Sequence, residues 1–345
     1  MRIFYIGQLW EGGTCRERML ALRSLGHDVV PFDSTPWTSG GVRAFRSLAH
    51  RINSGPNVWG MNRVLVNYSR SIGSVDLIWV DKGRWIYPES LETIRGQTRG
   101  RSLHYTPDPQ LVHHQSRHFE RCVPRYDWVV TTKPFEVELY RTLNAKNVLL
   151  VLQGFDRRFS EYRHILHHNS AWSSDACFVG HFENHYAARL KSVSEAASQL
   201  RIWGPGWKRY AKCNRWAQPY VSGDGVWGDD YLHALANAKI AIGLLSKRIP
   251  ETTTTRSFEI PAIGTFLLAE RTDDHLALFD EGKEAEFFAD DKELKSKISF
   301  YLANDGARKK IAAAGRERCL RSGYSSESQL RAILDRLSEA GVGPV

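Results

Sequence analysis

The chain has 345 residues, of which 42% are hydrophobic and 25% charged, and its formal net charge is +9. This length suits two domains of about 150 residues better than one, and no apolar run approaches the roughly 18 residues that cross a bilayer. The five cysteines are scattered and form no C-x-x-C pair, which argues against a disulfide framework or a zinc site. With no signal peptide pattern at residues 1–7, we expect a cytoplasmic protein.

Strand-like and helix-like segments alternate along the first part of the chain, which is typical of a parallel sheet covered by helices. The expected strands are 2–6, 28–32, 75–80, 102–106, 128–131 and 148–152, and the expected helices are 14–25, 88–95 and 134–143. We place a domain boundary after residue 155, where a glycine turn follows the last strand.

The same alternation starts again in the second part. The expected strands are 176–179, 201–203, 240–244 and 265–269, and the expected helices are 189–200, 230–238, 255–263, 291–304 and 307–320. The sequence therefore predicts two α/β domains, an N-terminal one over 1–155 and a C-terminal one over 156–345. Ligands of such sheets gather at the carboxyl ends of the strands.

The first strand runs into a loop that contains Gly7, Gly12 and Gly13. The loop has the G-x4-G frame of a P-loop, but Gly13 stands where that loop requires a lysine. It also lacks the G-x-G-x-x-G pattern of dinucleotide-binding enzymes. A nucleoside triphosphatase and a nicotinamide enzyme are therefore disfavoured.

Positive charge is concentrated in the first part, where residues 1–155 hold 20 Lys and Arg against 13 Asp and Glu. No acidic residue stands between Asp33 and Asp76, although five arginines do, interleaved with apolar residues: Arg43, Arg46, Arg51, Arg63 and Arg70. This stretch suits an anionic membrane surface or an anionic acceptor. A solvated insertion explains it equally well. Nucleic acid is not expected as a partner, because no recognised binding module is present.

Two carboxylates, Glu251 and Glu259, stand eight positions apart on either side of a threonine run. Threonines are good N-cap residues, so a helix is expected to start near Thr255 and to end at Gly264. The N-terminus of this helix, with Arg256 in its first turn, suits a diphosphate. Glu259, one turn deeper, can accept hydrogen bonds from sugar hydroxyls. A capped surface helix with two solvated glutamates is the other interpretation of the spacing.

The segment 256–268, RSFEIPAIGTFLL, resembles the signature of GT-B glycosyltransferases of the CgeB-like branch, which are relatives of the retaining, nucleotide-sugar-dependent transferases with E-x7-E. The likeness covers most of residues 175–325 and is looser over the first 155. It implies the GT-B fold, in which two Rossmann-like α/β domains with parallel sheets face an interdomain cleft. It also implies a UDP- or GDP-linked sugar donor and a glycan, lipid-linked or other cell-envelope acceptor.

The resemblance also suggests roles for individual residues. Glu259 is expected to bind the donor ribose and Glu251 the donor sugar, while the diphosphate is expected near Thr255 and Arg256. Further candidates around the donor are Gly180, His181, Arg189, Trp203 and Gly204. For Arg189 a surface position is the other interpretation. The loop of Gly7, Gly12 and Gly13 is expected beside the acceptor and the transferred sugar.

Asp108 lies between two prolines at the end of an expected strand. It is a candidate general base or acceptor-hydroxyl ligand, and a turn-stabilising aspartate is the other interpretation. No metal is expected, because D-x-D is missing and His113, His114 and His118 do not have metal-site spacing. A non-catalytic surface or coat protein on the same scaffold is the alternative function, and the intact Arg256 and Glu259 argue against it.

Overall fold

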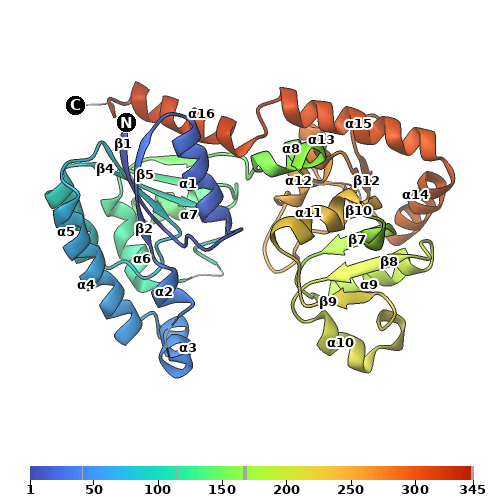
Figure 1. Ribbon diagram of the computed structural model, residues 1–345, viewed down its shortest axis with the longest axis horizontal. Helices are drawn as coiled ribbons and strands as arrows, with labels where there is room; N and C mark the ends of the chain where they lie inside the picture. The colour runs from blue at the N-terminus through green and yellow to red at the C-terminus, as the bar shows by residue number, and fades with distance from the viewer. Residues whose placement is uncertain (41, 113–114, 166–168, 343–345) are drawn as a thin grey trace. The chain divides into compact units, whose positions relative to one another are not determined.

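The computed structural model describes residues 1–40, 42–112, 115–165 and 169–342, and the chain forms two compact units (Figure 1). Unit 1 comprises Met1–Gln153 and Ser326–Val345, and unit 2 comprises Gly154–Ser325. Each unit holds one six-stranded sheet in which every pairing is parallel. The prediction of two Rossmann-like domains is therefore confirmed.

The sheet of unit 1 has the order β2-β1-β3-β4-β5-β6. Its strands are β1 (Arg2–Gly7), β2 (Asp28–Asp33), β3 (Leu77–Asp81), β4 (Arg101–Thr106), β5 (Trp128–Thr131) and β6 (Val148–Leu150). Its helices are α1 (Thr14–Ser24), α2 (Thr35–Thr38), α3 (Arg43–Ile52), α4 (Pro56–Ser71), α5 (Pro88–Thr98), α6 (Arg117–Cys122), α7 (Glu136–Thr142) and α16 (Ser326–Glu339). The order of the strands reverses between β1 and β3.

The sheet of unit 2 has the order β12-β11-β10-β7-β8-β9, so its reversal lies between β7 and β10. Its strands are β7 (Ser174–Val179), β8 (Leu200–Trp203), β9 (Val221–Gly223), β10 (Ala238–Gly243), β11 (Phe266–Glu270) and β12 (Glu286–Phe288). Its helices are α8 (Arg157–Ile165), α9 (Asn184–Ser194), α10 (Trp207–Cys213), α11 (Gly228–Ala236), α12 (Arg256–Ile263), α13 (Asp273–Leu278), α14 (Asp291–Ala303) and α15 (Asp305–Arg321).

Alternate side chains of each strand enter the cores on the two faces of its sheet, as a pleated strand requires. In unit 1, Phe4 and Ile78 pack with residues of α4 and α5 on one face. Tyr5 and Trp79 pack with α1 and α16 on the other. The strands are therefore buried on both sides, which is why they are short, continuous apolar runs in the sequence.

The structure differs from the expected elements in several places. Strands β9 and β12 and helices α6, α8, α10 and α13 were not expected. Helices α2, α3 and α4 occupy the arginine-rich stretch, for which no helix was expected. Helix α9 begins earlier than expected, at Asn184, and ends at Ser194. The last helix, α16, belongs to unit 1 instead of closing the second domain, because its apolar side enters the same core as α1, through Leu330, Ile333, Leu334 and Leu337.

A buried ion pair fixes α1 to the end of β3. Arg18 Nε lies 2.7 Å from Asp81 Oδ2, and Arg18 Nη2 lies 3.0 Å from Asp81 Oδ1. The Tyr5 hydroxyl donates to the same carboxylate at 2.6 Å, and the Arg18 guanidinium stacks over the Tyr105 ring at 4.7 Å. Both oxygens of the buried aspartate thus accept hydrogen bonds, and the start of α1, with the glycine loop before it, is anchored to the sheet.

Replacing Asp81 with Asn should lower the free energy of unfolding by about 3–5 kcal/mol, because Arg18 would stay buried without its counter-charge. Calorimetric unfolding measures the loss, and adding Arg18→Met should restore most of it. Arg121→Met is the matched control, since its pair with Glu89 is exposed on both sides and should contribute less than about 1 kcal/mol. Equal losses for the two pairs would contradict the anchoring role.

Candidate functional site

The switch point of unit 2 brings two loops together at the carboxyl ends of β7 and β10, where ligands of doubly wound sheets bind. The Ser246 hydroxyl, after β10, donates to Glu183 Oε1, after β7, at 2.8 Å. His181 Nε2 lies 2.7 Å from the same oxygen. Glu183 is 3% exposed, and although burial alone would raise its pKa, these hydrogen bonds lower it below the usual value. Glu183 is therefore ionised, and its carboxylate joins the two loops by hydrogen bonds.

Glycine is required at Gly204, the turn after β8. A Cβ there would lie 1.9 Å from the carbonyl oxygen of Gly180, and the backbone has φ +149°. The Trp207 indole donates to that same carbonyl at 2.9 Å. The predicted turns at 180–181 and 203–204 are therefore in contact, and Trp207 is a buried core residue.

Helix α12 follows the prediction for its ends, with Thr255 at the N-cap and Gly264 in the left-handed conformation at the C-cap. A buried histidine holds its first turn. His275 Nδ1 faces the carbonyl of Glu270 at 2.7 Å and must donate, so Nε2 accepts from the Ser257 hydroxyl at 2.8 Å. Burial lowers the pKa of His275, which keeps this neutral arrangement. The α12 N-terminus is thus tied to the end of β11.

Glu259 lies inside this arrangement and is 8% exposed. The Tyr231 hydroxyl of α11 donates to Glu259 Oε2 at 2.6 Å. Burial raises the pKa of Glu259 to about 7, despite hydrogen bonds from Tyr231 and Thr255 that lower it. The carboxylate is therefore costly to keep ionised, and the solvated-glutamate interpretation does not hold for Glu259.

Arg256 lies one turn before Glu259 and forms no ion pair among the residues described. Its Nε is buried and has no hydrogen-bond partner in that part of the chain. A buried guanidinium N–H without an acceptor is unusual and costs free energy. An anion beside the first turn of α12 would supply the acceptor.

The other donor-side candidates are engaged in different ways. Glu251 accepts a hydrogen bond from the backbone N–H of Ser246 at 3.0 Å, so it joins the switch-point loops. Arg189 does not: its guanidinium contacts Asp291 of α14 and lies 6.0 Å from the Phe288 ring centre. Trp203 is buried in the core and packs near Trp172. The structure thus brings Glu251, Arg256 and Glu259 to one end of the sheet, with Arg189 paired elsewhere.

Unit 1 has a cavity of about 270 Å³ at its own switch point. It is lined by the end of β1, by the turn after β3 and by helices α2 to α4, through residues that include Gly7, Thr38, His50, Met61, Lys82 and Arg84. Lys82 adopts a positive φ of 69°. A strained non-glycine residue at a strand end is typical of functional turns.

Asp108 lies beside this turn. Its carboxylate is 2.6 Å from Lys82 Nζ, and both side chains are about one third exposed, at 36% and 33%. The Thr106 hydroxyl donates to the Asp108 carbonyl at 2.9 Å, which fixes the short turn. Glu136 holds the next residues, accepting from the Leu111 N–H at 2.7 Å.

The glycine loop of unit 1 is folded onto itself. Gly13 donates to the Trp10 carbonyl at 3.1 Å, and a Cβ on Gly13 would lie 2.8 Å from the Trp10 ring. Gly12 has φ 77° and Gly7 lines the cavity. Within the described residues, no group of three or more His, Cys, Asp or Glu is placed to hold a metal ion. His113 and His114 lie outside the residues described.

Three participants were not predicted from the sequence, namely Tyr231, Glu183 and Lys82. Tyr231 could not be predicted from a local pattern, because its hydrogen bond to Glu259 joins residues that are 28 positions apart. Glu183 follows β7 and Lys82 follows β3, which are the strands at the two switch points. Their place just after an expected strand is the sequence feature from which they could have been predicted. In the described residues no helix is long and apolar enough to cross a membrane.

Comparison with known proteins shows what the chain resembles. Residues 185–335 match the family model described as glycosyl transferase-like. No curated protein matches the chain significantly in sequence.

Several solved structures share the fold across both units. HepE from Anabaena, solved with UDP and glucose, is 14% identical with a TM-score of 0.64 over 98% of this chain and 100% of that one. Sucrose-phosphate synthase from Thermosynechococcus elongatus is 15% identical, with a TM-score of 0.65 over 99% and 100%. An α-glucosyltransferase solved with UDP-glucose and DNA containing an abasic site is 14% identical, with a TM-score of 0.68 over 98% and 99%.

These structures confirm the predicted GT-B fold of two Rossmann-like domains. Residues 185–335 thus resemble a glycosyl transferase-like family, and the two-domain fold is the one seen in these GT-B structures.

Proposed function

We propose that the protein, a member of the CgeB-like branch, transfers a sugar from a nucleotide-diphosphate donor, UDP- or GDP-linked, that binds at the switch point of unit 2. The observation that carries this proposal is the Arg256 Nε, buried and without a partner among the described residues, at the first turn of α12 and close to Glu259. A diphosphate offers the missing acceptor. The UDP bound in structures of the same fold agrees with this chemistry.

Glu259 would bind the donor ribose. Its Oε2 accepts from Tyr231 at 2.6 Å, which fixes the carboxylate and leaves acceptor capacity on both oxygens for vicinal hydroxyls. Arg256, Thr255 and the α12 N-terminus would stabilise the charge that develops on the leaving diphosphate. The loop of Gly180 and His181 would lie near the phosphates, Trp203 and Gly204 near the base, and Glu251 at the transferred sugar. Arg189 remains a weaker candidate because it pairs with Asp291.

The acceptor would bind in unit 1, at the cavity beside Lys82. The strand ends of a switch point are where ligands of such sheets bind, and Gly7, Gly12 and Gly13 let the backbone approach it. Asp108 would contact an acceptor hydroxyl, and Lys82, whose Nζ lies 2.6 Å from its carboxylate, would hold the Asp108 side chain in place. Arg84, which also lines the cavity, would favour an anionic acceptor such as a cell-envelope glycan or a lipid-linked precursor.

The reaction would need no divalent metal and would retain the anomeric configuration, as the kinship to E-x7-E enzymes suggests. The arginine-rich segment would bring the protein to the inner, cytoplasmic face of a membrane, since cations are attracted to anionic lipids. Nucleic acid is not part of the proposal.

Glu259→Gln should weaken UDP or GDP binding by roughly 10- to 100-fold, the loss of about 1.5–3 kcal/mol for charge-assisted hydrogen bonds. The free variant should nevertheless be more stable than the parent at pH 8. A carboxyl whose pKa rises from 4.5 to about 7 on folding stabilises the fold below pH 4.5, and that contribution disappears as pH rises through 7. The gain at pH 8 is on the order of 3 kcal/mol and should shrink toward pH 5.

Glu136→Gln is the matched control. Burial also raises the pKa of Glu136 to about 7, but this residue lies in unit 1. Its variant should show the same pH-dependent gain in melting temperature with unchanged nucleotide affinity in calorimetric titration. Equal nucleotide affinities for the parent and Glu259→Gln would remove Glu259 from the donor site.

Chelation should leave the enzyme active. With Arg256 and the α12 N-terminus at the leaving group, EDTA should change turnover of the donor by less than about twofold, whereas loss of a required metal costs orders of magnitude. Assays with EDTA, and then with added Mg²⁺ or Mn²⁺, check this. Strong rescue by either cation would contradict the proposed electrostatics.

A further inference from the structure

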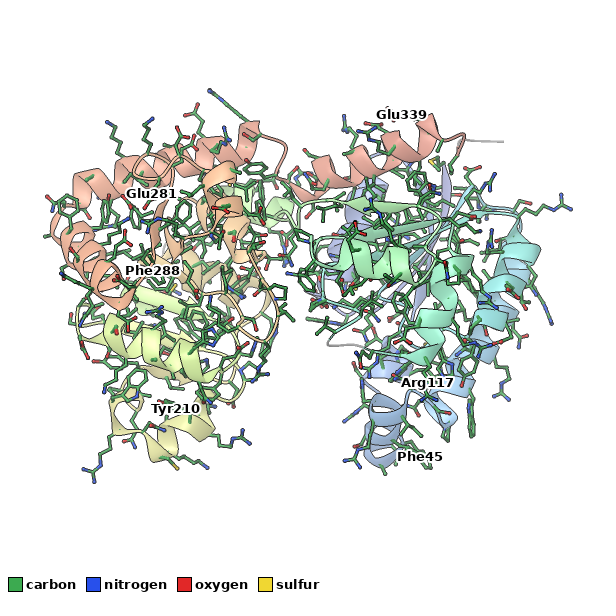
Figure 2. The ribbon with its side chains drawn as sticks, turned by 180° about the vertical axis from the view of Figure 1, so that it is seen from behind. Phe45, Arg117, Tyr210, Glu281, Phe288 and Glu339 are labelled. Carbon is green, nitrogen blue, oxygen red and sulfur yellow. The ribbon has the colours of Figure 1, made fainter. Side chains whose placement is uncertain are left out.

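Helix α3 turns its large apolar side chains outward. Phe45, Leu48 and Ile52 stand at positions i, i+3 and i+7, so they share one side of the helix. They are 45%, 43% and 54% exposed. In an ordinary surface helix such a stripe faces the core. Figure 2 shows Phe45 at the tip of unit 1, on a helix that projects from the sheet.

Polar contacts on the inner side keep this orientation. Arg46 Nη1 donates to the Ser39 carbonyl at 2.6 Å. His50 Nε2 faces the Thr38 carbonyl at 3.1 Å and therefore donates. Arg84 Nη2 donates to the His50 carbonyl at 2.9 Å. Because these bonds, together with buried Ala49, fix the rotation of α3, its apolar side cannot turn toward the core without breaking them.

The exposed apolar surface continues onto α4, where Trp59 is 57% exposed. The charges around it have one sign. The sequence contains no Asp or Glu between Asp33 and Asp76, while Arg51 and Arg63 are exposed on α3 and α4. Apolar side chains beside cations, without carboxylates, match the interface of an anionic bilayer, where acyl chains lie below phosphates. A nucleic acid would use the arginines but would gain nothing from the aliphatic stripe.

We propose that α3 and the start of α4 bind an anionic membrane, with Phe45, Leu48 and Ile52 inserted below the phosphates and Arg51 and Arg63 facing them. The inference rests on the membrane-side localisation in the proposed function and adds the surface that makes the contact. The same helices supply His50 of α3 and Met61 of α4 to the walls of the unit 1 cavity. The surface that touches lipid and the cavity that would receive the acceptor are therefore built by one segment of the chain.

The test is co-sedimentation with vesicles of phosphatidylcholine alone and of phosphatidylcholine mixed with phosphatidylglycerol. The parent should bind the mixed vesicles, and the triple variant Phe45→Ser, Leu48→Ser, Ile52→Ser should bind them on the order of tenfold less or weaker. Arg51→Gln with Arg63→Gln should reduce binding mainly at low ionic strength, because salt screens the cations but not the apolar insertion. Phe300→Ser is the matched control, since Phe300 is 52% exposed on α14 of unit 2 and should bind like the parent.

Two further measurements keep the result interpretable. The triple variant should melt only a few degrees below the parent, because about half of each replaced side chain is exposed, and it should keep the parent's affinity for UDP, because the nucleotide binds in unit 2. If the parent protein does not bind UDP, the proposed donor site is wrong, but the proposed membrane surface is not affected. Equal vesicle binding by the parent and the triple variant would overturn the inference. So would a parent that ignores the vesicles and self-associates through α3, as measured by sedimentation equilibrium.

Discussion

The parallel pairing of β7 with β10 is the constraint on which the donor side depends. Strands that are far apart in sequence lie side by side in the sheet, and helices leave from both at the same edge. The loops after them meet, and Glu183 and Ser246 join them by a buried hydrogen bond of 2.8 Å. Gly204 and Trp207, which follow the neighbouring strand β8, contact the Gly180 carbonyl. Donor-side candidates from residues 180 to 259, Arg189 excepted, thereby come to one sheet edge.

The same edge of the sheet carries two charged groups whose burial lowers the stability of the fold. Glu259 is buried with its pKa raised to about 7, and among the residues that the structure describes Arg256 Nε has no hydrogen-bond partner. The surroundings tolerate both because the first turn of α12 is held independently, through Ser257 and the neutral His275. Destabilised groups on a rigid support are typical of sites whose missing interactions come from a ligand.

Unit 1 also has charged residues at the switch point of its sheet, but there they have different roles. Its switch point between β1 and β3 also collects charge, but Asp81 is fully satisfied by Arg18 and Tyr5. That pair is structural, whereas Lys82 and Asp108 beside it are partly exposed and border a cavity. Of the helices that complete the cavity, α4 buries Val58, Met61 and Leu65 in the core, whereas α3 turns its large apolar side chains outward, the reverse of the usual surface helix. In unit 1, the fully buried pair of Arg18 and Asp81 supports the fold, and the partly exposed pair of Lys82 and Asp108 is the candidate for function.

Much of the architecture could be predicted from the sequence, because buried parallel strands are short apolar runs and their ends are marked by glycines. The strand Trp128–Thr131 has the predicted bounds, and α12 lies between the predicted cap Thr255 and Gly264. The GT-B fold followed from the resemblance around Glu259. Helices α2 to α4 were missed. On α3 the large apolar residues form an exposed stripe, which gives no sign of a core, and the buried stripe of α4, through Val58, Met61 and Leu65, was not recognised.

Only the tertiary structure decided which residues meet. The bond between Tyr231 and Glu259 spans 28 positions, and the Glu183–Ser246 bond spans 63; no local pattern specifies such contacts. Arg189 has the sequence context of a phosphate ligand, but α14 brings Asp291 against it. Helix α16 joins unit 1 because its apolar side fits the core around α1. Residue types and strand ends are local properties, whereas pairing, burial and the pKa values that follow from them are set by the packing of distant elements.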